Sequence, residues 1–388
     1  MRFSKNIIPI LVSSIICVQN PIWPLWKYGI GIWIGYLLTV LLLFILKERK
    51  YKFSKFSIFI LFFSFWTFLV FPLRYSLPLS NIFILLAYLS AQKISNEELR
   101  IALSYVTKFL AIIVSISLPM WLINAFVYEL PVIGQLDLSQ MKGAEYVYNN
   151  YLFFVTNAGK DYMRFYSMFD EPGVLGTFSA FVLFANKYRF NYQNTIILLG
   201  AIFTYSMAFY ILTFIGFIFY SMTSIKKMLI LLFSLSSICY VTYYFLRDDL
   251  AFNYAVISRI ESFGMDQVED RTDGITNNYW KKYIKSNDLY WGMGDEKPIL
   301  EGNSYKMFII EYGIQGTITL FLMYLVLIKK MNKSILCFCM IFILSFLQRP
   351  FAFRAWQILL FSCVVAELSS KKHFYIHLKN KSHKDVLS

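Results

Sequence analysis

Residues 163–181 read MRFYSMFDEPGVLGTFSAF, and within them a polar segment gives way to an apolar one. The polar half contains Arg164, Asp170 and Glu171, and the second half is almost entirely apolar. Pro172 suits the first position of a helix, where its missing N–H group is not needed and its fixed φ is already helical. Glu171 then falls at the N-cap, where its carboxylate can accept hydrogen bonds from free N–H groups. The stretch therefore predicts an apolar helix that begins at Pro172.

Similar apolar stretches recur along the whole chain. Of the 388 residues, 58% are hydrophobic and only 15% are charged, and the mean hydropathy is +0.54. About 20 apolar residues are enough for a helix to cross a bilayer. We expect an all-α polytopic membrane protein with about twelve transmembrane helices and two large periplasmic loops. The predicted helices lie at residues 7–19, 28–46, 56–72, 78–92, 101–128, 172–186, 195–206, 208–223, 228–246, 304–328, 334–347 and 351–368.

The distribution of basic residues predicts the orientation. If the N-terminus is cytoplasmic, 21 Lys and Arg residues lie in cytoplasmic segments and four lie in the short outer loops. Cytoplasmic loops are enriched in Lys and Arg, so we expect both termini in the cytoplasm. The same count favours two helices over one across residues 195–223, with a break near Ser206, because a single helix would move every later loop to the other side. We attribute the net charge of +14 to these basic loops and not to nucleic-acid binding.

The predicted helices divide the chain into six segments. Two long hydrophilic segments are expected on the periplasmic side, because long loops are translocated regardless of their charge. The second carries aromatic residues among carboxylates and amides, which suits either sugar binding or the core of a small helical cap. The segments are helices 1–5 in residues 1–128, the first periplasmic loop in 129–171, helices 6–9 in 172–246, the second periplasmic loop in 247–302, helices 10–12 in 303–368 and a basic cytoplasmic tail in 369–388.

Charged residues at the outer ends of the predicted helices are candidates for a binding site. Charges near membrane depth are costly and are commonly functional. Arg164 and Glu171 precede one helix, and Arg349 and Arg354 flank a tight outer turn. A guanidinium group forms two parallel hydrogen bonds with phosphate, so these arginines suit a lipid diphosphate at headgroup height. The simpler alternatives are helix capping by Glu171 and membrane anchoring by at least one arginine.

A second candidate lies in GNSYKMFIIEYGIQG, residues 302–316. Asn303 opens a predicted helix, and Glu311 falls within its outer half. Gly313 and Gly316 are expected to let a neighbouring helix approach closely. The alternative is a packing helix whose lysine extends toward the membrane interface.

No motif indicates a metal or another cofactor. The sequence contains no phosphate-binding glycine loop and no dinucleotide-binding turn. Its five cysteines all lie within apolar stretches, and its three histidines all lie in the C-terminal tail. We therefore expect no metal site and no cofactor. Nothing in the sequence resembles a nucleic-acid-binding module.

The chain resembles the O-antigen polymerases (Wzy type) within the O-antigen ligase and polymerase superfamily. One basis is the spacing of Arg164, Glu171 and Pro172 ahead of a predicted helix. Another is the layout of about twelve helices, a broken pair near Ser206 and two large outer loops. The resemblance covers nearly the whole chain and implies a glycosyltransferase of the bacterial inner membrane, active in lipopolysaccharide biosynthesis.

A further basis is a motif of the related ligases. Asn303, Gly313 and Gly316 match the spacing of that motif, but Gly302 stands where ligases have histidine. This departure favours the polymerase branch over a ligase that uses histidine as a base. A ligase lacking the histidine is the first alternative. A flippase or other transporter of lipid-linked oligosaccharides is the second, although the sequence shows no internal repeat and its outer loops are large.

The resemblance implies both the reaction and the partners. A growing glycan on undecaprenyl diphosphate would be transferred to the next lipid-linked oligosaccharide repeat unit, without a metal, and a chain-length regulator protein is a candidate partner. The acceptor hydroxyl would attack the anomeric carbon, and the lipid diphosphate would leave. We expect Glu171 and Arg164 to be catalytic, with Glu171 orienting or deprotonating the hydroxyl. The expected substrate-binding residues are Arg349, Arg354, Arg259 and Arg271 for the diphosphate and Asn303 and Tyr305 for sugar.

The predicted orientation is testable with reporter fusions. A periplasmic and a cytoplasmic reporter fused after residues 150, 275 and 385 should read outside, outside and inside, because this orientation places the basic loops in the cytoplasm. A periplasmic reading at residue 385 would contradict the predicted topology.

Overall fold

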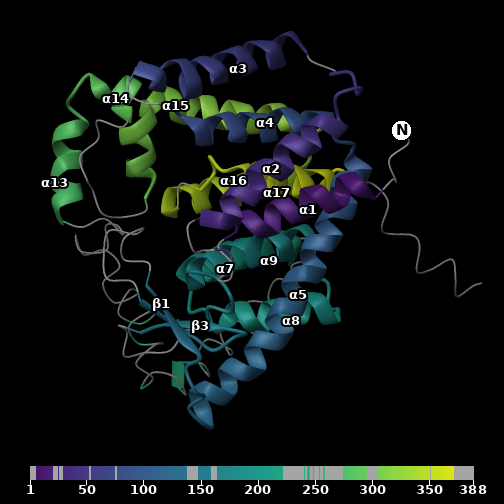
Figure 1. Ribbon diagram of the computed structural model, residues 1–388, viewed down its shortest axis with the longest axis vertical. Helices are drawn as coiled ribbons and strands as arrows, with labels where there is room; N and C mark the ends of the chain where they lie inside the picture. The colour runs from purple at the N-terminus through teal and green to yellow at the C-terminus, as the bar shows by residue number, and fades with distance from the viewer. Residues whose placement is uncertain are drawn as a thin grey trace, which may run out of the picture.

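Thirteen α-helices make up most of the described part of the computed structural model (Figure 1). The structure describes residues 6–20, 29–51, 54–74, 77–137, 147–158, 164–221, 274–294, 304–349 and 351–370, together with the isolated residues 25, 240, 243, 244, 248, 253 and 257. The predominantly helical fold agrees with the sequence-based expectation.

Helices occupy eleven of the twelve predicted stretches; the twelfth, 228–246, lies almost wholly outside the described residues. Two helices, α5 and α15, are long and apolar enough to cross a membrane by length and composition, and the other apolar helices are shorter. The number of membrane crossings therefore stays a prediction. The helices are α1 (Ile7–Gln19), α2 (Ile30–Ile45), α3 (Lys55–Phe65) with the π-helix η3 (Trp66–Val70) and the 3₁₀ turn η4 (Pro72–Arg74), α4 (Leu79–Lys93), α5 (Asn96–Phe126), α7 (Pro172–Ala185), α8 (Tyr192–Ile202), α9 (Met207–Ser221), α15 (Tyr305–Leu327), α16 (Lys333–Gln348) and α17 (Ala355–Leu368).

These helices are arranged in three layers (Figure 1). One layer contains α3, α4 and α15, the middle layer contains α1, α2, α16 and α17, and the third contains α7, α8 and α9. Helix α5 runs obliquely beside the last two layers and contacts α1, α8 and α17.

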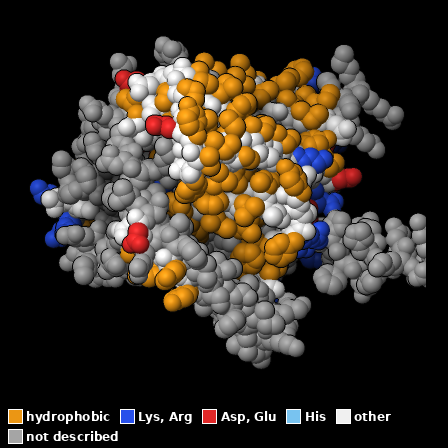
Figure 2. Space-filling view, turned by 90° about the horizontal axis from the view of Figure 1, so that it is seen from below, with side chains coloured by type: hydrophobic (Ala, Val, Ile, Leu, Met, Phe, Trp, Pro, Cys, Tyr) orange, Lys and Arg blue, Asp and Glu red, His pale blue; other side chains and the backbone are white. Residues whose placement is uncertain are grey.

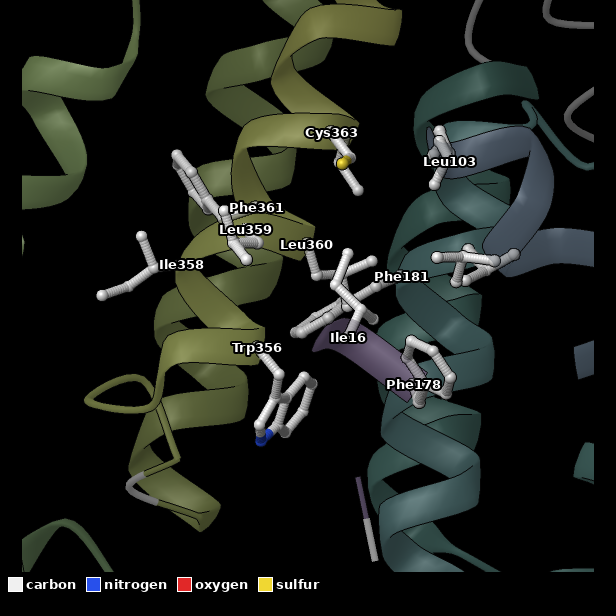
Figure 3. Close-up of a cluster of buried hydrophobic side chains, with 14 of the residues drawn as sticks. Ile16, Leu103, Phe178, Phe181, Trp356, Ile358, Leu359, Leu360, Phe361 and Cys363 are labelled. Atoms are coloured by element: carbon white, nitrogen blue, oxygen red, sulfur yellow. The ribbon is translucent and has the colours of Figure 1, made fainter. Parts of the chain in front are cut away.

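Helices α7 and α17 form the centre of the core. Every residue of α7 is buried, and every residue of α17 except Glu367 is buried. Helices that are apolar on all sides are expected in such a position. Figure 3 shows Phe178 and Phe181 of α7 facing α17, with Ile16 of α1 between the two helices. The Phe178 and Trp356 rings meet edge to face, with centroids 6.1 Å apart.

Large apolar side chains remain exposed along the outer helices. Figure 2 shows apolar side chains over much of one face of the molecule, with Lys and Arg side chains at opposite edges of the view. Monomeric soluble proteins rarely expose contiguous apolar patches of this kind. Among the exposed residues are Trp33, Leu37 and Phe44 on α2, Phe56, Phe59 and Phe62 on α3, Ile112 and Ile116 on α5, and Leu336, Met340 and Leu347 on α16.

The segment 129–171 contains a small sheet, which corrects the expectation of an all-α chain. Strands β1 (Gly134–Asp137), β2 (Val147–Asn150) and β3 (Val155–Asn157) pair antiparallel in that order. Strands of three or four residues are too short to show an alternating pattern in the sequence. The sheet lies on the same side of the bundle as α13 (Gly274–Tyr283) and α14 (Asp288–Trp291), two helices of the second predicted loop (Figure 1).

Helix α15 is interrupted at Gly313, where φ is 69° and ψ is −178°. Only glycine adopts this conformation without strain. Gly313 admits a close neighbour, as expected, and that neighbour is the C-terminal end of the short helix α14 together with Gly292, which follows it. A Cβ atom on Gly313 would lie 2.4 Å from the carbonyl oxygen of Tyr290. The backbone N–H of Met293 donates to the carbonyl oxygen of Ile310 at 2.8 Å.

Gly316 differs from the expectation that it admits a neighbouring helix. A Cβ atom on Gly316 would meet the side chain of Tyr312 in the same helix, at 2.3 Å. The Tyr312 ring in turn packs against Phe68 of η3 and Phe353. Gly316 thus makes room for an aromatic ring of its own helix, a requirement that the spacing of the two glycines does not reveal.

Replacing Gly313 with alanine should destabilise the protein. The added methyl group would clash with a backbone carbonyl, and the positive φ would cost about 1–3 kcal/mol by itself. We expect a lower thermal unfolding midpoint for Gly313→Ala purified in detergent. Gly134→Ala is the control, because a Cβ atom at that position would meet no other atom within 4 Å. Equal midpoints for the two variants would contradict the role assigned to Gly313.

Candidate functional site

A buried arginine, Arg349, lies against the first turn of α7 and comes from the end of another helix, α16. Helix α16 ends at Gln348, and Arg349 follows in an extended conformation with its backbone N–H bonded to the carbonyl oxygen of Ser345 at 2.9 Å. The sharp end of α16 directs the Arg349 side chain into the core, where only 3% of the residue is exposed. A cation so deeply buried needs compensating partners.

One partner is Glu171. The structure places Glu171 at the N-cap of α7 and Pro172 at its first position, as predicted. However, the Glu171 side chain makes no capping hydrogen bond, and its carboxylate forms an ion pair with Nη2 of Arg349. The carboxylate is 26% exposed, so the pair lies at the boundary between the core and the outside. The capping alternative therefore does not account for this carboxylate.

The Arg349 guanidinium group keeps unused donors. Within the part of the chain that the structure describes, its Nε and Nη1 atoms are buried and have no hydrogen-bond partner. Leaving a buried donor unsatisfied costs about 1–3 kcal/mol, and more for a charged group. The Phe351 ring, 5.6 Å from the guanidinium carbon, adds a cation–π contact but accepts no conventional hydrogen bond. The donors are arranged as expected for a site that receives an anion.

Gly173 provides the space for this arrangement. A Cβ atom on Gly173 would lie 2.6 Å from Nη2 and 3.1 Å from Cζ of Arg349. The guanidinium group thus rests directly on the first turn of α7. The N-terminal end of a helix is itself electropositive and favours anions. Arg349 and the helix end therefore both place positive charge beside the Glu171 carboxylate.

Arg164 supports the same helix through the break between α8 and α9. Its Nε atom donates to the carbonyl oxygen of Thr204 at 2.8 Å, and its Nη2 atom donates to that of Tyr205 at 2.9 Å. Ser206, the next residue, packs against Gly176 of α7, where a Cβ atom would lie 2.9 Å from the Ser206 Cβ. Arg164 therefore fixes the helix break that supports α7.

The break itself was predicted, but the role of Arg164 was not. Two separate helices, α8 and α9, replace the single long helix that was the alternative. Arg164 is 9% exposed, and two of its nitrogens bind backbone carbonyl groups. In this structure, Arg164 positions the candidate site, whereas Arg349 and Glu171 form it.

The structure describes two of the other predicted residues, Arg354 and Tyr305. Arg354 is the N-cap residue of α17, and its side chain is exposed. Tyr305 lies in the first turn of α15, where its ring meets Trp280 of α13 edge to face at 6.1 Å. Three further predicted residues lie outside the described residues, namely Arg259, Arg271 and Asn303.

Two residues near the outer ends of the helices were missed or misread from the sequence. In the alternative interpretation of residues 302–316, Lys306 extends toward the membrane interface, but it is 6% exposed and donates to Oδ1 of Asn277 in α13 at 3.1 Å. Its ammonium group also lies 5.9 Å from the centre of the Trp280 ring. Gly173 was not singled out, although a glycine in the first turn of a buried helix signals a close neighbour.

The site offers no evident metal ligands beyond Glu171. Among the residues that the structure describes, no group of three or more His, Cys, Asp or Glu side chains could hold a metal ion. No model of a known protein family, no curated protein and no solved structure matches the chain.

Replacing Arg164 with alanine should lower the stability of the protein. The carbonyl groups of Thr204 and Tyr205 would lose their donor, and each buried group left unsatisfied costs about 1–3 kcal/mol. We expect a lower unfolding midpoint in detergent for Arg164→Ala. Arg164→Lys should show a smaller decrease, because an ammonium group still donates hydrogen bonds but cannot bind both carbonyl groups in the same geometry. The exposed Arg354→Ala is the control. A midpoint unchanged in Arg164→Ala would contradict the positioning role.

Proposed function

We propose that the chain is a multi-pass protein of the bacterial inner membrane that polymerises lipid-linked oligosaccharide repeat units into O-antigen. It would transfer the growing glycan from undecaprenyl diphosphate to the next repeat unit on the periplasmic side. The observation that carries the proposal is the buried Arg349 guanidinium group, with two unused donor nitrogens, at the electropositive end of α7. The resemblance of the Arg164, Glu171 and Pro172 spacing to the polymerases supports the same function.

Three features support the membrane location. Helices α5 and α15 are long and apolar enough to cross a bilayer. The outer helices expose large apolar side chains, which lipid would cover (Figure 2). The sequence places 21 basic residues on one predicted side and four in the short loops of the other, which is the asymmetry of inner-membrane proteins.

The proposed chemistry assigns the leaving diphosphate to Arg349. A diphosphate that accepts from Nε and Nη1 would complete the hydrogen bonding of the guanidinium group and spread its own negative charge as the glycosidic bond breaks. The site would bind the diphosphate in this way without a metal ion.

Glu171 would act on the other substrate. Its carboxylate is partly exposed and sits beside the guanidinium group, so it would accept the proton of the acceptor hydroxyl as that oxygen attacks the anomeric carbon. The new C–O bond forms as the bond to the diphosphate breaks, and the proton passes from Glu171 to solvent. Arg164 would keep α7 in place for both groups.

The role of Arg349 is testable with a conservative change. Arg349→Lys should lower the rate of polymerisation by purified enzyme about 100-fold or more, because an ammonium group cannot supply the planar set of donors. The protein level in the membrane, followed by immunoblot, should stay close to that of the wild type. Arg189→Lys serves as the matched control, since Arg189 is exposed and lies between α7 and α8, on the predicted cytoplasmic side. Equal activity in Arg349→Lys and the wild type would remove Arg349 from the site.

Deletion of the gene separates the proposed function from the two alternatives. Without a polymerase, single repeat units are still transferred to lipid A-core, so a gel of lipopolysaccharide should show one band above the core and no ladder. The gene supplied in trans should restore the ladder. Bare core with polymer retained on undecaprenyl diphosphate would indicate a ligase, and bare core with single repeats on the cytoplasmic leaflet would indicate a transporter.

A further inference from the structure

A second polar site lies at the end of the bundle away from Arg349. Helix α17 begins beside the outer turn at Arg354 and ends at Leu368, roughly 21 Å farther along its axis. At that far end the structure contains a cavity of about 90 Å³ between α3, α4, α5, α15 and α17. This volume is far below the roughly 300–1,000 Å³ of ordinary small-molecule pockets, so the cavity fits a small group and not an oligosaccharide. Its polar lining consists of Ser57, Gln92, Asn96, Lys329, Ser362 and Ser369.

The cavity offers donors to an anion. The amide nitrogen of Gln92 is buried, and no residue in the described ranges accepts a hydrogen bond from it. Lys329 stands at the exposed mouth, where its ammonium group lies 3.5 Å from both the carbonyl oxygen of Ile94 and Oδ1 of Asn96. Both distances are at the outer limit for hydrogen bonds, so each of these two contacts is weak.

A carboxylate near the cavity is already neutralised. Glu98 forms two hydrogen bonds of 2.7 Å with Arg49 and accepts another from Ser95. Burial by itself raises the pKa of Glu98, but the hydrogen bonds from Arg49 and Ser95 outweigh it and the pKa is lowered. The carboxylate therefore stays ionised and paired, and it does not compete with an anion for Lys329.

We propose that this cavity binds the phosphate of an anionic phospholipid headgroup from the inner leaflet. The apolar part of the lining, which includes Leu99, Val326 and Val365, suits the glycerol end of a lipid better than a hydrated ion. The neighbouring Phe56 and Leu325 are exposed on α3 and α15, where acyl chains would cover them. Basic pockets between helices on the cytoplasmic side are suited to anionic headgroups. The proposal rests on the membrane location proposed above, but it does not depend on polymerase activity.

The bound lipid would join the cytoplasmic ends of three helices. Gln92 lies at the end of α4, Asn96 begins α5, and Lys329 follows α15. One headgroup that binds all three would hold the cytoplasmic ends of these helices together. Binding energy of this kind stabilises the folded state in proportion to the logarithm of lipid concentration.

Native mass spectrometry of the full-length protein in detergent tests the site. Phosphatidylglycerol should bind in a saturable 1:1 complex, whereas phosphatidylcholine and inorganic phosphate should bind at least about fivefold more weakly. Lys329→Gln should weaken phosphatidylglycerol binding about fivefold, the change expected for one lysine at an anionic headgroup. Gln92→Leu should also weaken it, because the amide donor is lost without a large change in volume.

Lys330→Gln is the matched control, because Lys330 is adjacent and exposed but does not line the cavity. It should leave the affinity unchanged. Equal losses in Lys329→Gln and Lys330→Gln would overturn the site in favour of general surface electrostatics. Inorganic phosphate that binds as tightly as phosphatidylglycerol would overturn the assignment to lipid. All of these measurements are independent of the lipopolysaccharide gel, so failure of the polymerase proposal would leave the lipid result standing.

Discussion

Backbone carbonyl groups that a helix break leaves unpaired inside an apolar core need a donor from elsewhere, and this constraint organises the molecule. The structure supplies such a donor at three helix breaks. At the π-helix η3, Asn81 donates to the carbonyl oxygen of Phe68 at 2.9 Å. Between α8 and α9, Arg164 donates to two carbonyl groups. In α15, the N–H of Met293 donates to the carbonyl oxygen of Ile310, and the hydroxyl of Tyr283 donates to that of Ile309.

Each donor comes from a different part of the chain, so each break ties two segments together. Arg164 links the first predicted outer loop to α8 and α9, and through Ser206 to α7. Tyr283 and Met293 link the second predicted outer loop to α15. The outer segments are therefore fastened to the helices by the same hydrogen bonds that make the breaks tolerable. A candidate site at the outer end of the bundle gains a rigid surrounding in this way.

The sequence predicted those features that depend on local residue type. Pro172 marks the start of α7, the apolar stretches mark the helices, and the basic count favours a break before Met207. The sequence did not predict which groups donate hydrogen bonds to the carbonyl groups at the helix breaks. The carbonyl groups bound by Arg164 lie 40 and 41 residues away and belong to the backbone, which carries no residue-specific signal. For the same reason, the sequence indicated a close neighbour at Gly313 but not which one, namely the end of α14 and Gly292.

The ion pair between Glu171 and Arg349 explains the role of Glu171, which local sequence patterns left open. A carboxylate before Pro172 suggests a helix cap, but the helix that ends at Gln348 brings Arg349 to it, 178 residues along the chain. That contact exists only because Gly173 leaves room for a guanidinium group. Only the folded chain, therefore, distinguishes the capping role from the ion pair.

Arg349 is one of the exceptions to the rule that buried polar groups are satisfied, and this exception carries the functional argument. A buried ion pair is weak evidence for stability, because removing both charges from water costs about as much as their attraction returns. Arg349 keeps such a pair and also leaves two of its nitrogens without acceptors among the described residues. Replacing a buried ion pair with well-packed apolar residues is often neutral or stabilising, so stability alone does not explain this arrangement. The arrangement is understandable if an anionic ligand completes the guanidinium group during function: the ligand would share the positive charge of Arg349, and Glu171 would then be released to interact with the second substrate.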